Sequence, residues 1–368
     1  MSPPATEAVL SGLAWDEFCD TLKRAGQQVL RKDAPATELD RAEGWRYLTR
    51  LLRIGLEMHL EFADPDFPGF FAPSHETGKI GADNPDNLYL MARIAGRHEY
   101  TIRGKRGSVS YLSFGSQKGG YETDGRMEQT GFLDGRDLHL EPDGGFVVHV
   151  SREPRAGNWL KIEDASNAII VRQTFLDRRS ESPASMGIAR TDTAGLHPKP
   201  LDAATIATAL QRTAGFVEGT AQVFANWATS YASHVNALPS ADQAVCQRAG
   251  GDPNIHYYHS AWAVEPDQML VIRLPRIPEC RFWNLQLNNW WMESLDYRHH
   301  RIHHNQHSAR SNDDGSVTLV IAHRDPGHAN WLDTAGHTRG TMCLRWVGAR
   351  EHVDPVTELR PFAKGRFT

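Results

Sequence analysis

The chain has 368 residues and a net charge of −5, is 23% charged, and has four scattered cysteines without a Cys-x-x-Cys pair. These values exclude a basic surface for nucleic acid, a disulfide framework and a cysteine zinc site, and no apolar run approaches the roughly 20 residues that cross a bilayer. Because the N-terminal residues also lack the pattern of a signal peptide, we expect a cytoplasmic protein of two domains that binds neither nucleic acid nor a membrane.

Residues 1–63 are predicted to form a helical segment. Apolar residues recur at helical spacing from residue 5 to about residue 62, and the breaker Asp33-Ala34-Pro35 interrupts them. Thr37 followed by Asp40 resembles the start of a second helix. The loop that follows is rich in Pro, Gly and Asp and is too long for a simple turn.

Short strands with turn signals then predict a β-domain over residues 64–200. The predicted strands lie at 88–96, 98–104, 108–115, 146–151 and 168–175, and a polar connector follows them. A helix from about Asp202 to Ser233, within a linking segment at 201–240, leads to further strands between Tyr257 and Trp346 and a polar tail. We therefore predict a mainly β chain with two tandem antiparallel β-sandwich or jelly-roll domains, the second at 241–368.

Two stretches of the chain, 143–160 and 314–332, have nearly the same pattern. Both contain Asp-Gly, an alternating apolar strand, a Pro/Gly turn and Asn-Trp-Leu, and they lie about 172 positions apart. The match extends to flanking strands, with 169–172 opposite 342–345. Self-similarity of this kind predicts an internal duplication. Residues that both copies share are expected to be structural, and residues that one copy alone carries are candidates for function.

The shared polar residues fit a structural role. Both Asn-Trp-Leu motifs follow a turn, so their asparagines are expected to bond backbone groups and their tryptophans to plug the sandwiches. Arg172 and Arg345 occupy matched positions at strand ends, where they either pair with carboxylates or bind an anionic ligand. We favour structural ion pairs.

The second copy resembles a known family. The strand Asp314–Ile321, the turn Asp325-Pro326-Gly327, Asn330-Trp331-Leu332 and Leu344-Arg345-Trp346 are similar to the C-terminal signature of the bacterial domain-of-unknown-function family 1214, over roughly residues 265–348. The first copy loosely resembles family 1254, which often precedes it. The resemblance implies a tandem β-sandwich or jelly-roll protein, commonly a homo-oligomer, from bacteria that handle unusual small molecules, and it supplies no reaction.

A histidine-rich segment at 288–313 is present in copy two alone. Its histidines are His299, His300, His303, His304 and His307. On a helical turn the i,i+4 spacing would let His299, His303 and His307 bind one divalent transition-metal ion. Alternatively, His303 and His307 act as acid and base without a metal, or the segment is a solvated arm that contacts another subunit.

Aromatic residues of copy two are candidates for substrate binding. Adjacent Trp290 and Trp291 on a strand face opposite sides, so only one of them points into the core. Together with Trp283 and Tyr258 they would pack an aromatic, steroid-like or sugar ligand, and the alternative is ordinary core and dimer packing.

These features lead to a prediction of function. No dinucleotide, P-loop, serine-hydrolase or zincin motif is present, so we expect no nucleotide cofactor. We predict a bacterial enzyme of small-molecule catabolism, a non-redox hydrolase or lyase for an apolar or aromatic substrate. His303 or His307 would transfer the proton or hold a metal, and Tyr297 and Arg310 would polarise a substrate oxygen. The alternative is a non-catalytic ligand-binding or assembly protein.

Overall fold

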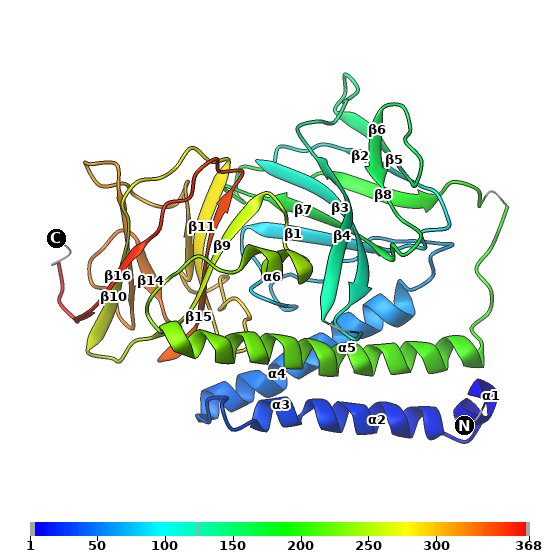
Figure 1. The fold of residues 1–368 in the computed structure, drawn as a ribbon, viewed down its shortest axis with the longest axis horizontal. Coiled ribbons are helices and arrows are strands. Elements are labelled where there is room, and N and C mark those ends of the chain that lie inside the picture. Colours follow the sequence, from blue (N-terminus) through cyan, green and yellow to red (C-terminus); the bar gives the residue numbers. More distant parts are fainter. Residues whose placement is uncertain (1–3, 124, 194, 366–368) are drawn as a thin grey trace.

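The structure is a computed structural model that describes residues 4–123, 125–193 and 195–365. Two groups of strands lie side by side, and a layer of helices runs along one side of both groups (Figure 1). The helices are α1 (Ala5–Leu10), α2 (Leu13–Ala25), α3 (Gln27–Leu30), α4 (Glu38–Leu56), the π-helix η1 (Glu57–Glu61), α5 (Ala203–Ser230), the 3-10 helix η2 (Tyr231–His234) and α6 (Gln243–Arg248). The predicted class, mainly β with helical additions, is confirmed.

The two long helices begin where side chains bind their first free backbone N–H groups. Thr37 Oγ1 accepts a hydrogen bond from Asp40 N (3.2 Å) at the start of α4, and Asp202 Oδ1 accepts one from Thr205 N (2.8 Å) at the start of α5. Both starts agree with the prediction. No helix in the described part of the chain is both long and apolar enough to cross a membrane.

The first group of strands forms two four-stranded sheets. In chain order its strands are β1 (Asn87–Arg93), β2 (Tyr100–Lys105), β3 (Tyr111–Gly120), β4 (Arg126–Asp134), β5 (Gly145–Ser151), β6 (Asn158–Lys161), β7 (Ala168–Thr174) and β8 (Ser185–Arg190). The sheet orders are β1-β7-β3-β4 and β6-β5-β2-β8. Side chains such as Phe114, Val148 and Leu160 are fully buried in the core of this sandwich.

The second group repeats this arrangement. Its strands are β9 (Ile255–Ala263), β10 (Gln268–Leu274), β11 (Phe282–Asn288), β12 (His303–Asn305), β13 (Val317–Ala322), β14 (Trp331–Asp333), β15 (Arg339–Val347) and β16 (Val356–Pro361). The sheet orders are β9-β15-β11-β12 and β14-β13-β10-β16, so each strand takes the place of the strand eight positions earlier. The predicted duplication is confirmed. Pairing is antiparallel in both copies apart from the parallel pairs β5–β6 and β13–β14.

The Asn-Trp-Leu motifs make the same bonds in both copies. Asn158 Oδ1 accepts from His139 N (2.7 Å), and its Nδ2 donates to the carbonyl oxygens of His139 and Val147. Asn330 does the same with the backbone of Arg310 and with the carbonyl oxygen of Thr318. These asparagines bond backbone groups, as predicted, and they hold the short parallel strand of each copy in place.

Several strands were missing from the prediction. β8 lies in the stretch predicted as a polar connector, β16 lies in the predicted polar tail, and β4 was not recognised. β8 pairs only with β2 and β16 only with β10, so both are edge strands that carry polar residues toward solvent. Polar edge strands lack the apolar alternation on which the prediction depended.

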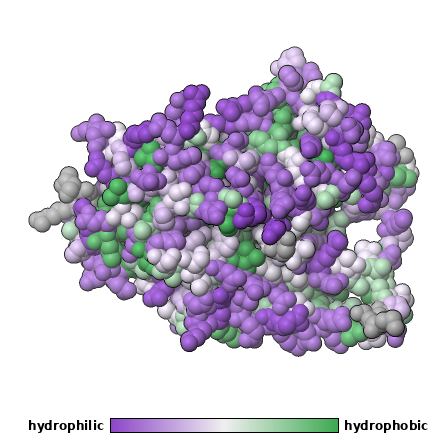
Figure 2. All heavy atoms as spheres, in the orientation of Figure 1, coloured by the Kyte–Doolittle hydropathy of each residue, from purple (hydrophilic) through white to green (hydrophobic). Residues whose placement is uncertain are grey.

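A third apolar core lies outside the two sandwiches. It joins the helices to one sheet of each copy, β1-β7-β3-β4 and β9-β15-β11-β12, through residues such as Tyr47, Ile170, Phe224 and Trp291. The face of the molecule seen in Figure 2 is mostly hydrophilic, with small scattered apolar areas. The helices therefore cover the two sheets that would otherwise expose an apolar face.

Candidate ligand cavity between the two copies

The three histidines predicted as metal ligands do not converge. His303 Nε2 lies 3.1 Å from Asp86 Oδ1, His307 Nε2 lies 3.8 Å from Asp177 Oδ2, and His299 is exposed on a turn. Among residues 4–123, 125–193 and 195–365 no group of three or more His, Cys, Asp or Glu side chains is placed to hold a metal ion. The segment forms a turn and the short strand β12, so the i,i+4 spacing does not put these side chains on one face.

Of the two predicted polarising residues, Tyr297 lies beside His303, with the rings edge-on and their centres 6.5 Å apart. The Tyr297 ring packs under the ammonium group of Lys79, 4.8 Å from its centre. Arg310 donates its backbone N–H to Asn330 Oδ1 (2.7 Å), in the bond that His139 makes in copy one. The backbone of Arg310 is thus part of the scaffold that both copies share.

The predicted substrate-binding aromatics are packing residues. Trp283 and Tyr258 lie in the core of the second sandwich, where Trp283 packs against Trp346 at 6.0 Å. Trp291 donates from Nε1 to the carbonyl oxygen of Asp40 (2.9 Å), and Trp290 packs against it at 4.7 Å. Both indole rings are buried in the core that joins the helices to the sheets, and this packing accounts for the adjacent tryptophans without a ligand.

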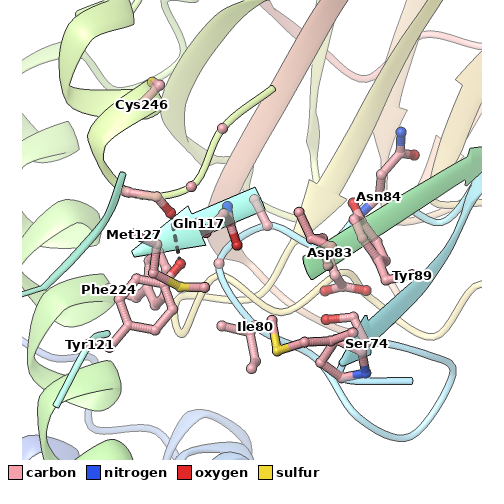
Figure 3. A pocket seen from close by; sticks show the side chains of 18 of the residues that line it. Ser74, Ile80, Asp83, Asn84, Tyr89, Gln117, Tyr121, Met127, Phe224 and Cys246 are labelled. Atoms are coloured by element: carbon pink, nitrogen blue, oxygen red, sulfur yellow. Dashed lines mark hydrogen bonds between the residues drawn. The ribbon is translucent and has the colours of Figure 1, made fainter. Parts of the chain in front are cut away.

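A cavity of about 170 Å³ lies where the facing sheets of the two copies meet the middle of α5. Figure 3 shows that Tyr121, Met127 and Phe224 gather at one end and Asp83, Asn84 and Tyr89 at the other, with Gln117 and Ile80 between them. Its lining includes the charged side chains of Asp83, Arg93, Glu122, Arg172 and Arg345 and the polar side chains of Tyr89, Gln117, Tyr257 and His259. Rings and a thioether gather at one end, and the carboxylate of Asp83 lies at the other. None of the predicted site residues lines it.

The two arginines are held by loops that cross between the copies. The loop before β1 presents the carbonyl oxygen of Ala82 to Arg345 Nη2, and the loop before β9 presents that of Gly250 to Arg172 Nη2 (2.5 Å). Ala82 and Gly250 both have positive φ angles, 57° and 94°. For alanine this conformation costs roughly 1–2 kcal/mol, and such strain is frequent at functional sites. Each copy therefore supplies the backbone that binds the other copy's arginine.

The same two loops differ in charge at three positions: Asn84 matches Asp252, Asp86 matches Asn254, and Asp83 matches Gly251. Asn84 and Asp252 both precede proline, and their backbone N–H groups donate to Tyr89 and Tyr257 respectively. Asp252 Oδ2 lies 3.9 Å from Arg172 Nη1, an ion pair that is almost fully buried. The preference for structural ion pairs therefore holds for Arg172.

Arg345 has no such partner. It is 5% exposed and donates to the carbonyl oxygen of Ala82, to Gln286 Oε1 (2.5 Å) and to Asn284 Oδ1 (3.4 Å). No Asp or Glu in the described residues forms an ion pair with it. The Asp83 carboxylate, which also lines the cavity, attracts the guanidinium only from a longer distance, so an anionic ligand would be the first charged group in direct contact with Arg345. For Arg345 the structure thus points to the other predicted alternative, an anionic ligand.

The groups around the arginines are neutral donors and acceptors. Burial raises the pKa of Tyr89 and of Tyr257, although the two guanidinium groups act in the opposite direction. Burial and the charge of Arg345 lower the pKa of His259 to about 3, so its imidazole is neutral at physiological pH. Its Nδ1 has no hydrogen-bonding partner among the described residues. Burial also raises the pKa of the Cys343 thiol beside it.

One signal in the sequence could have located this site. Asn84-Pro85-Asp86 before β1 and Asp252-Pro253-Asn254 before β9 are a further pair of duplicated motifs. Their alignment would have placed two loops beside the matched arginines and would have shown the Asn/Asp difference. The prediction concentrated instead on the residues that were abundant in copy two.

Comparisons with known proteins agree with this fold. Residues 263–351 match the family described as "Protein of unknown function (DUF1214)", and the resemblance of the first copy to family 1254 is not confirmed. The crystal structure of an uncharacterized protein from Burkholderia cenocepacia is 60% identical, covers 97% of this chain and 99% of that chain, and has a TM-score of 0.96. The VPA0106 protein from Vibrio parahaemolyticus is 10% identical, covers 91% and 99%, and shares the fold at a TM-score of 0.50. No curated protein matches.

Proposed function

The chain belongs to the family of the uncharacterized Burkholderia cenocepacia protein and carries a DUF1214 match at residues 263–351, and we propose that it binds a small carboxylate with an apolar body. The binding site is the cavity between the two copies. The carboxylate lies at the arginine end and the apolar body at the α5 end.

The observation that carries the proposal is the state of Arg345. Its guanidinium is buried and bonded only to neutral oxygens, whereas the matched Arg172 has the carboxylate of Asp252. A guanidinium binds a carboxylate through charge-assisted hydrogen bonds, and a ligand anion would supply the direct carboxylate contact that Arg345 lacks among the described residues. The tyrosine hydroxyls of Tyr89 and Tyr257 accept backbone N–H bonds and keep their own protons for a ligand oxygen.

The size and lining of the cavity define the rest of the ligand. Its volume of about 170 Å³ is similar to that of an engineered cavity of roughly 150 Å³ that admits benzene. Its far end is formed by rings and sulfur atoms, among them Tyr121, Met127 and Phe224. One aromatic ring or a short alkyl chain fits this space, with a short link to the carboxylate.

Turnover of the ligand is the second part of the proposal. A hydrolase or lyase needs a group that exchanges a proton with the substrate or with water. In this cavity the candidate is the imidazole of His259, which takes the role predicted for His303 and His307 as a weak base, because its pKa is lowered to about 3. Non-catalytic binding is the alternative, and it is supported by the thiol in the cavity wall, since burial raises the pKa of Cys246 to about 12 and leaves it without nucleophilic character.

Calorimetry with acids and their amides tests the binding. We expect 3-phenylpropanoate and hexanoate to bind, and the corresponding neutral amides to bind at least about tenfold more weakly, because they cannot neutralise Arg345. Equal binding of acids and amides, or no binding of either, would refute the proposal. Mass spectrometry of the bound acid after incubation separates turnover from simple binding.

The variant Asn84→Asp gives a sharper test. It places a carboxylate where copy two has Asp252, so Arg345 gains an internal counter-ion and the ligand's carboxylate is repelled. We expect the dissociation constant of 3-phenylpropanoate to rise about tenfold or more. Asn226→Asp is the matched control, because Asn226 also faces an arginine, Arg31 (2.9 Å), but on the exposed surface of α5. An equal effect of the two variants would show that overall charge, not the site, controls binding.

A further inference from the structure

The side-chain amide of Gln117 is buried in the cavity wall without a hydrogen-bonding partner. Gln117 is 3% exposed and lies on the cavity face of β3, two residues beyond Gly115 and four beyond Ser113. Neither its oxygen nor its nitrogen bonds to another of the described residues. A buried carboxamide without partners is unfavourable, so a group in the cavity is expected to complete it.

The duplicated copy shows which partners are missing. Pairing with the arginine strand matches Gln117 to Asn288, because Gln117 lies opposite Ala168 in β7 and Asn288 lies opposite Thr341 in β15. In copy two the amide is satisfied: Asn288 Oδ1 accepts from Gln286 Nε2 (2.6 Å), and its Nδ2 donates to Thr341 Oγ1 (3.3 Å).

In copy one both of these partners are absent. The residue of copy one that is equivalent to Gln286 is Gly115, which has no side chain, and the residue equivalent to Thr341 is Ala168, which has no hydroxyl. A Cβ added at Gly115 would lie 3.2 Å from Ile170 Cγ2 and 3.9 Å from Arg172 Nη1. Copy one therefore offers Gln117 neither of the side-chain partners that Asn288 has.

We infer that the carboxylate ligand carries a hydroxyl group, which the Gln117 carboxamide binds as both donor and acceptor. The inference rests on the proposed function and names the substrate class, a small hydroxy acid with an apolar or aromatic body. An amine is the other common group that could serve the amide oxygen, but at neutral pH it is an ammonium ion, which Arg172 and Arg345 would repel. A hydroxyl group is neutral and both donates and accepts.

The backbone around Gln117 fixes its position. The pairing of β3 with β4 shifts register between Ser116 and Gln117, which leaves Thr130 as an extra residue in β4. Thr130 Oγ1 is bonded to Ser116 Oγ (2.8 Å) and Ser166 Oγ (2.7 Å), so the irregularity is held by hydroxyl groups behind the cavity wall. In Figure 3 Gln117 lies between the polar and apolar ends. The hydroxyl is therefore expected on the body of the ligand, away from the carboxylate.

Matched ligands test the inference. Calorimetry compares 3-phenylpropanoate with 3-(4-hydroxyphenyl)propanoate, 3-(3-hydroxyphenyl)propanoate and 3-hydroxy-3-phenylpropanoate, and each hydroxy acid with its methyl ether. We expect at least one hydroxy acid to bind about fivefold to tenfold more tightly than the parent and than its ether, the effect of one buried hydrogen bond.

Two variants assign that preference to Gln117. Gln117→Leu removes the amide, and Ala168→Thr restores the hydroxyl that satisfies the equivalent amide in copy two. Both are expected to abolish the preference for the hydroxy acid, measured in each variant as the ratio of its affinity to that for 3-phenylpropanoate. Ala168→Thr, which lies outside the cavity lining, is also expected to leave the affinity for 3-phenylpropanoate within about twofold of the wild type. A retained preference in either folded variant overturns the assignment to Gln117.

The outcomes separate this inference from the proposed function. If the wild-type protein binds none of the acids, the proposed function fails. If it binds them all equally and Asn84→Asp still weakens binding, the carboxylate site stands and the hydroxy-acid inference is wrong, with water filling the amide's bonds instead.

Discussion

The two copies of the duplicated fold are nearly identical in framework and differ in the groups that directly contact their arginines. Both have eight strands in the same sheet positions, the same Asn-Trp-Leu bonds and a buried arginine on the strand next to the cavity. Arg172 faces a carboxylate, whereas Arg345 faces only neutral oxygens. The difference shows how a duplicated scaffold can become a site: the framework stays constant, and exchanges beside the matched arginines leave one of them without a carboxylate in direct contact.

The crossing loops make the two copies depend on each other. Ser113 of copy one donates to Asp252 of copy two (3.1 Å), and Asn284 of copy two donates to Asn84 of copy one (2.6 Å). Neither copy could form its arginine environment alone. Both copies are thus needed to form the cavity, so no sequence motif within one copy identifies it.

The largest expected effect separates the two arginines. Arg172→Met removes the guanidinium beside the fully buried Asp252 carboxylate and is expected to lower the free energy of unfolding by about 3 kcal/mol, since Tyr111 and Ser113 still donate to Asp252. Arg345→Met removes a guanidinium that contacts no carboxylate directly, so we expect a smaller loss of stability but at least a 30-fold weaker binding of 3-phenylpropanoate, about 2 kcal/mol. Urea denaturation and calorimetry on both variants provide the measurements. Equal losses of stability would contradict the difference between the copies.

The next largest effect, a loss of stability that depends on pH, is expected at the ion pair that attaches copy two to α4. His337 Nε2 lies 2.7 Å from Glu43 Oε2, and both side chains are buried. Burial acts against either charge, but the mutual contact outweighs it, so the pKa of His337 is raised from 6.5 and the pKa of Glu43 is lowered from 4.5.

The sign of each shift defines the window in which the pair stabilises the fold. The contribution of His337 is complete below pH 6.5 and is lost as the pH rises through its raised folded value, whereas that of Glu43 is complete above pH 4.5 and is lost as the pH falls. His337→Asn should lower the free energy of unfolding by about 2 kcal/mol at pH 5.5. This loss is smaller than for a buried carboxylate left with no partner, because Arg46 and Asn289 still bind Glu43. Denaturation at pH 5.5 and 8.5 checks this, and an equal cost at both values would contradict it.

Much of the fold, and little of the site, was predictable from the sequence. Apolar periodicity located α4, α5 and most strands, because these elements bury one face. The site escaped because its residues are few, ordinary and far apart: Asn84, Gln117 and Arg345 come from three segments that only the folded chain brings to one cavity. The prediction concentrated on histidine and tryptophan because both are abundant in copy two, yet Trp283 and Trp291 are buried packing residues.

A smaller effect is expected when the surroundings of Arg172 in copy one are made like those of Arg345 in copy two. Asp252→Asn gives Arg172 the neutral partner that Arg345 has, and the freed guanidinium becomes a second cation for the ligand. We expect 3-phenylpropanoate to bind severalfold more tightly and to raise the melting temperature of the variant more than that of the wild type. Unchanged affinity would show that Arg172 does not reach the ligand.

The smallest effect is expected in the segment that copy two alone possesses. His299 and His307 are exposed, and the contact of His307 with Asp177 is a surface ion pair at 3.8 Å. Surface pairs of this kind contribute about 0–1 kcal/mol. His299→Ala and His307→Ala should therefore leave both the melting temperature and the affinity for 3-phenylpropanoate unchanged. Elemental analysis of the wild type and both variants completes the test, because stoichiometric metal that is lost on substitution would return the site to the histidine segment and make the arginine cavity secondary.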